Sequence, residues 1–239
     1  MKSRVYVCHT YYHALITIVK ELLMPKEERG KATLILSRMA NDFGTLDVRV
    51  RECGLFEEVL MYDEKEDFRF DELKKYRVDT GNIVTNMWNR IIFTKKFGKL
   101  LEPDVPVDFK QYKDIYVFCD SDPIGFYLSY KKIPYHAIED GLDTLKYCDQ
   151  ARYTNRGHFG IKAWMAAHNL IFIENGYAKY CIDMEVNDIS CCPYPLPNFI
   201  EVNRNEMFDK LTEEDKRLLV GLFIENMPQL EEQLEKVPA

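Results

Sequence analysis

The residues best suited to chemistry in this chain are Glu139 and Asp140, adjacent carboxylates that follow the apolar run 135–138 and precede Gly141. Open α/β sheets place their chemistry at the carboxyl ends of strands, and this run has the composition of a strand. Gly141 can adopt a positive φ without a Cβ penalty, so a sharp turn would bring both carboxylates to the rim of the sheet. Two close carboxylates repel each other, which makes one a better proton acceptor near neutral pH. The alternative is a solvated acidic turn in which Asp-Gly supplies only turn chemistry.

A second polar loop follows the β-rich run 4–8 and reads His-Thr-Tyr-Tyr-His. Thr10 is a suitable N-cap for a helix over 11–23, and the amides at such a helix start favour an anion or a polar ligand. The candidate ligand contacts in this loop are His9, Thr10, Tyr11 and His13. Either histidine could equally be a partly buried hydrogen-bonding residue. The loop has no glycine-rich fingerprint, so it does not predict a dinucleotide site.

A third loop, Asp120-Ser121-Asp122-Pro123, follows the clearest strand of the chain, 115–119. Its polar residues could cap a helix over 124–131, with Pro123 in the first turn. Alternatively, Asp120, Ser121 and Asp122 supply a hydroxyl-binding group. Strand carboxyl ends meet at one edge of a parallel sheet, so all three loops would converge on one cleft.

Strands and helices alternate along the chain in a way that predicts the elements carrying these loops. Apolar or β-rich runs predict strands at 4–8, 32–36, 58–62, 115–119 and 134–138, and helical periodicity predicts helices at 11–23, 42–53, 82–101 and 124–131, with a polar helical stretch at 63–77. The helix over 82–101 carries an apolar stripe that we expect to be core, namely Met87, Trp88, Ile91, Ile92 and Phe97. The fold class predicted is α/β, a Rossmann-like doubly wound parallel sheet.

Composition narrows the classes of protein to be considered. A chain of 239 residues with 46% hydrophobic content favours one domain over 1–200, followed at 201–239 by a C-terminal helical segment or the start of a linker. The net charge of -7 and the absence of a long basic run argue against a nucleic-acid partner. No stretch predicts a membrane span or a signal peptide, so we expect a cytoplasmic protein. The seven cysteines contain no C-x-x-C pair, so they predict neither a zinc site nor a disulfide framework.

Two of these motifs carry a resemblance to a known family. The strand at 4–8 followed by His-Thr-Tyr-Tyr-His, and later Tyr-His-Ala-Ile-Glu-Asp-Gly-Leu at 135–142, resembles the N-terminal half of bacterial sialyltransferases of glycosyltransferase family 52, which act in lipooligosaccharide biosynthesis. Bacterial polysialyltransferases are more distantly similar. The shared acidic, acidic, glycine motif is matched by Glu139, Asp140 and Gly141, and the resemblance covers roughly the first 200 residues.

The resemblance implies the N-terminal, acceptor-side half of a GT-B glycosyltransferase. Such enzymes transfer sialic acid with inversion from CMP-sialic acid to a galactose-type glycan acceptor, with no metal ion or cofactor. Asp140 would be the general base and Glu139 would tune or orient it, or the two roles would be exchanged. Acceptor contacts would come from the His9 and Asp120 loops and from Gly141. Partners would be the glycan acceptor and the nucleotide-sugar donor, and the resemblance allows a homodimer and peripheral membrane association through a lipid-linked acceptor.

The chain also departs from this family. Related enzymes carry a His-Pro motif and a serine-rich motif in the donor-binding domain, whereas none of the five histidines here precedes proline and no Ser-Ser pair occurs. The expectation is therefore that the donor-binding domain is missing from this chain, that a second chain supplies it, or that transfer has been lost. A non-catalytic α/β binding or interaction domain and a transferase for another nucleotide sugar remain the alternatives.

Overall fold

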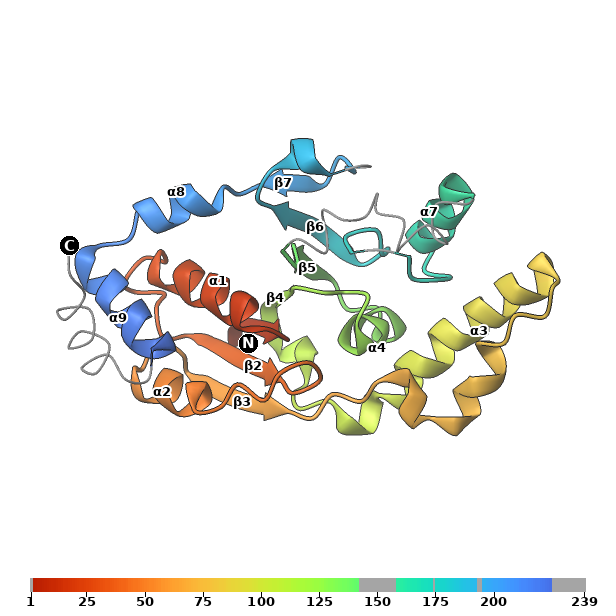
Figure 1. Ribbon diagram of the computed structural model, residues 1–239, viewed down its shortest axis with the longest axis horizontal. Helices are drawn as coiled ribbons and strands as arrows, with labels where there is room; N and C mark the ends of the chain where they lie inside the picture. The colour runs from red at the N-terminus through yellow and green to blue at the C-terminus, as the bar shows by residue number, and fades with distance from the viewer. Residues whose placement is uncertain (1, 142–157, 174, 193–194, 225–239) are drawn as a thin grey trace, which may run out of the picture.

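Seven parallel strands form one sheet in the order β3-β2-β1-β4-β5-β6-β7 in the computed structural model of this chain, which describes residues 2–141, 158–173, 175–192 and 195–224 (Figure 1). The strands are β1 (Lys2–Cys8), β2 (Ala32–Ser37), β3 (Glu58–Tyr62), β4 (Tyr112–Val117), β5 (Tyr135–Ile138), β6 (Cys181–Val186) and β7 (Phe199–Glu201). All six pairings between neighbours are parallel. The predicted fold class, an α/β Rossmann-like doubly wound sheet, is therefore confirmed.

Helices connect the strands and cover the sheet on both sides. The described α-helices are α1 (Tyr11–Leu22), α2 (Leu46–Glu52), α3 (Ile83–Leu100), α4 (Pro123–Lys131), α7 (Phe159–Ala167), α8 (Arg204–Asp209) and α9 (Glu213–Phe223). Short 3-10 helices lie at Asp67–Arg69, Asp71–Tyr76, Glu102–Asp104, Phe109–Gln111 and Ile189–Cys191.

Alternation along β1 separates the core into two halves, one on each face of the sheet. Val5 and Val7 pack with α3 and α4, whereas Tyr6 and Cys8 pack with α1, α2, α8 and α9. Successive strand side chains point to opposite faces, so a strand buried on both faces must be apolar nearly throughout. This requirement explains the continuous apolar runs of β1 and β2.

Helix α1 is fixed on the sheet by a buried charge cluster. Arg4 of β1 donates from Nε and Nη2 to the two carboxylate oxygens of Glu21, at 2.7 and 2.9 Å, and the Tyr6 hydroxyl donates to the same carboxylate at 2.8 Å. At the other end of the helix, the Thr10 hydroxyl accepts from the His13 amide, so the predicted N-cap is confirmed. The start of α1 is thereby held at the carboxyl end of β1.

The C-terminal part of the described chain returns to the face covered by α1 and α2 (Figure 1). Met207 and Leu211 at α8, and Leu219 and Leu222 of α9, belong to the same apolar cluster as α1. Arg49 of α2 donates from Nε to the Leu222 carbonyl at 2.7 Å. The expected helical segment after residue 200 thus packs against α1 and α2 as far as residue 223, and residues 225–239 lie outside the described part.

Three local expectations were wrong in detail. Helix α2 begins at Leu46 and not at 42, because Phe43 and Gly44 adopt positive φ. The stretch 63–77 forms two short 3-10 helices. Trp88, expected in the core, is 62% exposed because the first half of α3 projects beyond the sheet, whereas Phe97 in the second half is buried (Figure 1).

Position 125, in the first turn of α4, requires glycine because the backbone of Asp120 lies against it. A Cβ at this position would lie 1.8 Å from the Asp120 carbonyl oxygen. We predict that Gly125→Ala lowers the free energy of unfolding by about 3 kcal/mol, because the added methyl must displace backbone. Urea unfolding measures the change. Gly221→Ala in α9 is the control, because its Cβ meets nothing within 4 Å, and it should stabilise by about 0.5–1 kcal/mol. Equal effects of the two substitutions would contradict the prediction.

Candidate active site

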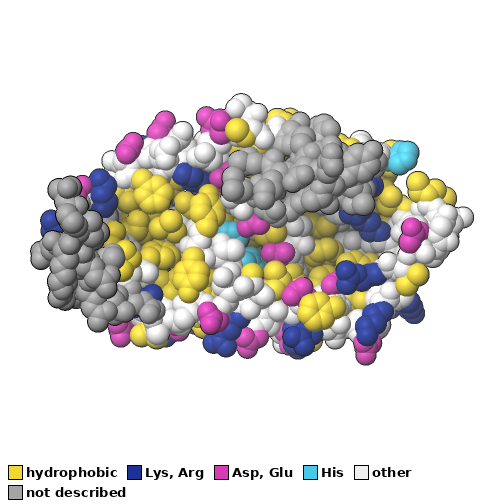
Figure 2. All heavy atoms as spheres, viewed as in Figure 1, with side chains coloured by type: hydrophobic (Ala, Val, Ile, Leu, Met, Phe, Trp, Pro, Cys, Tyr) yellow, Lys and Arg dark blue, Asp and Glu magenta, His cyan; other side chains and the backbone are white. Residues whose placement is uncertain are grey.

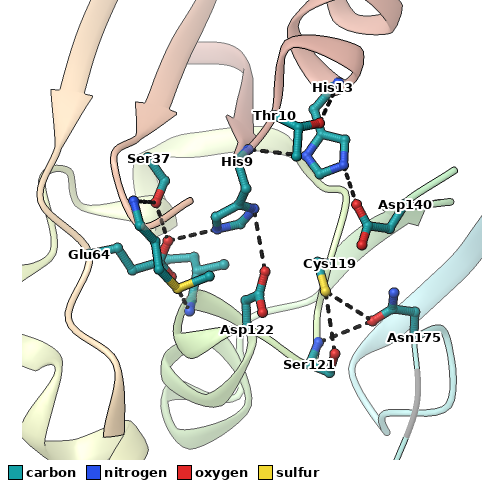
Figure 3. A network of polar contacts seen from close by, with 12 residues as sticks. His9, Thr10, His13, Ser37, Glu64, Cys119, Ser121, Asp122, Asp140 and Asn175 are labelled. Atoms are coloured by element: carbon teal, nitrogen blue, oxygen red, sulfur yellow. Dashed lines mark hydrogen bonds and ion pairs between the residues drawn. The ribbon is translucent and has the colours of Figure 1, made fainter. Parts of the chain in front are cut away.

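The strand order places a topological switch point between β1 and β4. The chain moves outward from β1 through β2 to β3 and then returns to β4 on the other side of β1. The connections after β1 and β4 therefore leave in opposite directions, which opens a crevice at the carboxyl ends of these strands where ligands bind in doubly wound folds. His9 follows β1 and Asp122 follows β4, and both lie at this crevice (Figure 3).

A buried ion pair forms the base of the site. His9 Nε2 lies 2.7 Å from Glu64 Oε2, and neither side chain is more than 2% exposed. The same Glu64 oxygen accepts from the Ser37 hydroxyl at 2.7 Å, and its other oxygen accepts from the Ile124 amide at 2.7 Å. The second ring nitrogen of His9, Nδ1, has no hydrogen-bond partner among the described residues and lies 3.7 Å from Asp122 Oδ2. The His9 ring thus carries a polar atom directed toward Asp122 (Figure 3).

These contacts change the charges at neutral pH. Burial lowers the pKa of His9, but the Glu64 carboxylate more than offsets this effect, so the pKa is raised to about 9. For Glu64, burial raises the pKa, but His9 and the hydrogen bonds outweigh it and the pKa is lowered. Burial raises the pKa of Asp122 to about 6 despite the opposing charge of His9. The site therefore holds a charged imidazolium beside a carboxylate that titrates near neutrality.

His13 holds Asp140 through a fixed tautomer. Its Nδ1 accepts from the His9 amide at 3.0 Å, so that nitrogen carries a lone pair and the proton of the neutral ring is on Nε2. Nε2 then donates to Asp140 Oδ1 in a short hydrogen bond. Burial lowers the pKa of His13 despite the nearby Asp140, and the ring stacks on Phe118 at a centroid distance of 4.4 Å. A neutral, fixed imidazole is suited to orient a carboxylate and not to carry protons itself.

Glu139 and Asp140 lie in different surroundings, although both contact the first turn of α1. Glu139 accepts from the Tyr12 hydroxyl at 3.2 Å and from the Asn187 amide at 2.7 Å, and Arg204 Nε lies 4.0 Å away. The Glu139 side chain is 4% exposed, whereas that of Asp140 is 20% exposed. Gly141 has the expected positive φ of 66°. The turn thus presents Asp140 to the crevice and leaves Glu139 inside, so the expectation that both reach the rim holds for Asp140 alone.

The other predicted site residues have mainly structural contacts. Asp120 is fully buried, accepting from the Tyr135 hydroxyl at 2.7 Å and from the Gly176 amide at 3.2 and 3.3 Å. The Ser121 amide donates to Asn175 Oδ1 at 3.2 Å, and its hydroxyl lies 3.3 Å from Cys119 Sγ. Thr10 is the cap of α1. The Tyr11 ring packs on Phe43, with centroids 5.3 Å apart, and takes no part in the contacts between His9, His13 and the carboxylates given above.

Sequence reasoning missed Glu64, Ser37 and Asn175. Glu64 comes two residues after the end of β3 and Ser37 is the last residue of β2, so both satisfy the strand-end rule that identified the other loops. Asn175 lies between α7 and β6, and only the folded chain brings this segment next to Ser121 in the loop after β4. The position of Glu64 just after a predicted strand could have identified it, but it is one of many charged residues in the run 63–77.

The described residues contain no group of three or more His, Cys, Asp or Glu side chains arranged to hold a metal ion. Among the described helices, none has the length and apolar character to cross a bilayer.

Comparison of the chain with protein-family models, with curated proteins and with solved structures finds no match. The chemistry of the site is therefore inferred from its geometry: a fixed carboxylate, a second carboxylate that titrates near pH 6 and a buried cation at one crevice.

The His9–Glu64 pair predicts a pH dependence of stability. The folded pKa of His9 is about 9 against an ordinary value of 6.5, so its contribution is complete below pH 6.5 and is lost as the pH rises through 9. We expect the free energy of unfolding to fall by up to about 3 kcal/mol over this window. The contribution of Glu64, whose pKa is lowered, is present above pH 4.5 and is lost on further acidification.

Urea unfolding at pH 6 and at pH 9 tests this expectation with Glu64→Gln, which should remove most of the loss between the two values. Glu66→Gln, at an exposed carboxylate two residues away, should keep it. An unchanged alkaline loss in Glu64→Gln would show that another group causes it.

Proposed function

We propose that this chain is the acceptor-side domain of an inverting glycosyltransferase that moves sialic acid from CMP-sialic acid to a galactose-type glycan. The observation that carries the proposal is the Asp140 carboxylate, held by neutral His13 at the end of β5 and partly open to the crevice. The Glu-Asp-Gly motif that resembles sialyltransferases of family 52 coincides with this strand end. Doubly wound domains commonly bind substrate at this edge, which supports the same reading.

In the proposed reaction, Asp140 accepts the proton of the acceptor hydroxyl as that oxygen bonds to the anomeric carbon of sialic acid. The bond from the anomeric carbon to the phosphate oxygen breaks, and CMP leaves with the electron pair. His13 is a positioning residue, because its Nδ1 is occupied by the His9 amide and only Nε2 faces Asp140. Glu139 supports the turn from inside through Tyr12 and Asn187.

The cation at His9 and the carboxylate of Asp122 provide complementary groups for the acceptor. Sugar hydroxyls both donate and accept hydrogen bonds, so a donor at His9 Nδ1 and an acceptor at Asp122 Oδ2, 3.7 Å apart, suit one or two of them. The nucleotide-sugar donor would bind mainly to a second domain or chain, and the reaction would need neither metal ion nor cofactor. We place this activity in the cytoplasm.

Asp140→Asn tests the proposed base. Transfer from CMP-sialic acid to lactose, measured as CMP release with the whole protein that the gene encodes, should fall in kcat by about 10³-fold. Lactose binding, measured by saturation-transfer NMR, should change little because the amide keeps the shape of the side chain. His13→Gln should lower kcat less, by about tenfold, and shift the pH profile.

Asp209→Asn at the end of α8 is the matched control for loss of an exposed carboxylate and should leave transfer unchanged. Full transfer by Asp140→Asn would overturn the assignment of the base. Lactose binding without transfer by any form would favour the non-catalytic binding domain, and transfer from another nucleotide sugar alone would correct the donor.

A further inference from the structure

The projecting part of α3 and the adjacent α7 expose an unusual concentration of apolar side chains. Val84 and Trp88 of α3 are 74% and 62% exposed, and Ile161 and Trp164 of α7 are 60% and 57% exposed. A groove between the two helices is lined by Ile83, Val84, Met87, Trp88, Ile91, His158, Ile161 and Lys162. Trp88 and Trp164 are the only tryptophans in the chain: Trp88 lines the groove, and Trp164 is exposed on α7, one turn after Ile161. We name the groove and these exposed side chains the α3–α7 face.

One face of α3 forms a continuous stripe that changes from apolar to cationic, with Ile91 partly buried in its middle. Residues three or four apart share a face of a helix, so the side chains follow one another in the order Val84, Trp88, Ile91, Lys95 and Lys99. Lys95 and Lys99 are exposed. On the buried side of the same helix, Gly98 packs against the backbone of α4, which fixes the helix on the domain while its first half projects (Figure 1).

The charge carried by α3 and α7 themselves is opposite in sign to that of the whole chain. The two helices carry Arg90, Lys95, Lys96, Lys99 and Lys162 and no Asp or Glu, whereas the chain has a net charge of -7. On the side drawn in Figure 2, Lys and Arg atoms lie over the region of α3, with Asp and Glu atoms among them. In the neighbouring segment 67–79, Asp67 pairs with Arg77, Asp71 pairs with Lys74, and Asp79 accepts from the Gly81 amide and from Asn86, whereas Glu72 is exposed.

We propose that the α3–α7 face docks on the surface of an anionic lipid bilayer. Exposed tryptophan with neighbouring aliphatic side chains suits the boundary between headgroups and acyl chains, and lysines beside it suit anionic headgroups. The cationic side chains that α3 and α7 carry complement the charge of an anionic bilayer, which favours a membrane surface as the occupant. Peripheral membrane association is among the expectations that the family resemblance allows, but the face lies on helices that the proposed transfer does not use, so vesicle binding and transfer can fail separately.

Tryptophan emission reports directly on this docking, because both tryptophans lie on the face. Vesicles of phosphatidylcholine with one quarter phosphatidylglycerol should shift the emission to shorter wavelength and give saturable binding, and 0.5 M NaCl should weaken it. Vesicles of phosphatidylcholine alone should produce little shift. Flotation of the full chain with the vesicles gives an independent measure.

Lys95→Glu with Lys99→Glu tests the charge and should weaken binding to the anionic vesicles by at least about 30-fold. The matched control is Lys210→Glu with Lys216→Glu, on exposed lysines next to α8 and in α9 at the other end of the molecule, which should bind within twofold of the wild type (Figure 1). Trp88→Ser should weaken binding while Trp164 still reports it.

Three results would overturn the proposal: no emission shift with anionic vesicles, equal weakening by the two double variants, or a shift without lipid that follows protein concentration. The last result, accompanied by a dimer in analytical ultracentrifugation, would assign the face to a second copy of the chain.

Discussion

The carboxylate of Glu64 is the contact on which the geometry of the crevice depends. It binds His9 after β1, Ser37 at the end of β2 and the Ile124 amide in the first turn of α4. Glu64 itself follows β3, so one side chain joins four elements at the carboxyl edge of the sheet. An unpaired charge at this depth would be costly, so the cation at His9 and the carboxylate stabilise each other's ionised form. The loops at the switch point are therefore fixed by electrostatics as well as by packing.

Two consecutive hydrogen bonds, from His9 to His13 and from His13 to Asp140, fix the position of Asp140 relative to the His9–Glu64 pair. The His9 amide binds His13 Nδ1, which leaves Nε2 to donate to Asp140 at the end of β5. Stacking on Phe118 fixes the plane of the His13 ring. One backbone amide thus decides the tautomer of a histidine, and that tautomer decides where a carboxylate points. The arrangement explains why two histidines lie four residues apart at the start of α1.

The acidic site and the exposed apolar residues of α3 and α7 lie in different parts of the molecule. Acidic and histidine side chains lie next to each other near the middle of the face drawn in Figure 2, whereas the cationic residues of α3 and α7 lie toward one end. The apolar stripe of α3 has helical periodicity in both halves, but only the second half faces α4. A period of 3.6 residues reports that one side of a helix is apolar and does not report what covers it. Trp88 is exposed for this reason.

The sequence by itself determined the sheet, because burial on both faces requires apolar strands and their alternation with helices is local information. It also determined that the His9 loop, the Asp122 loop and the turn at Gly141 lie at one edge, since parallel strands end together. Only the tertiary structure decided that His9 pairs with Glu64, a residue 55 positions away, and that Asp140 and not Glu139 is open to the crevice. The second choice depends on Asn187, Tyr12 and His13 being brought together by the order of the strands. Local periodicity carries no information about partners that are distant in the chain.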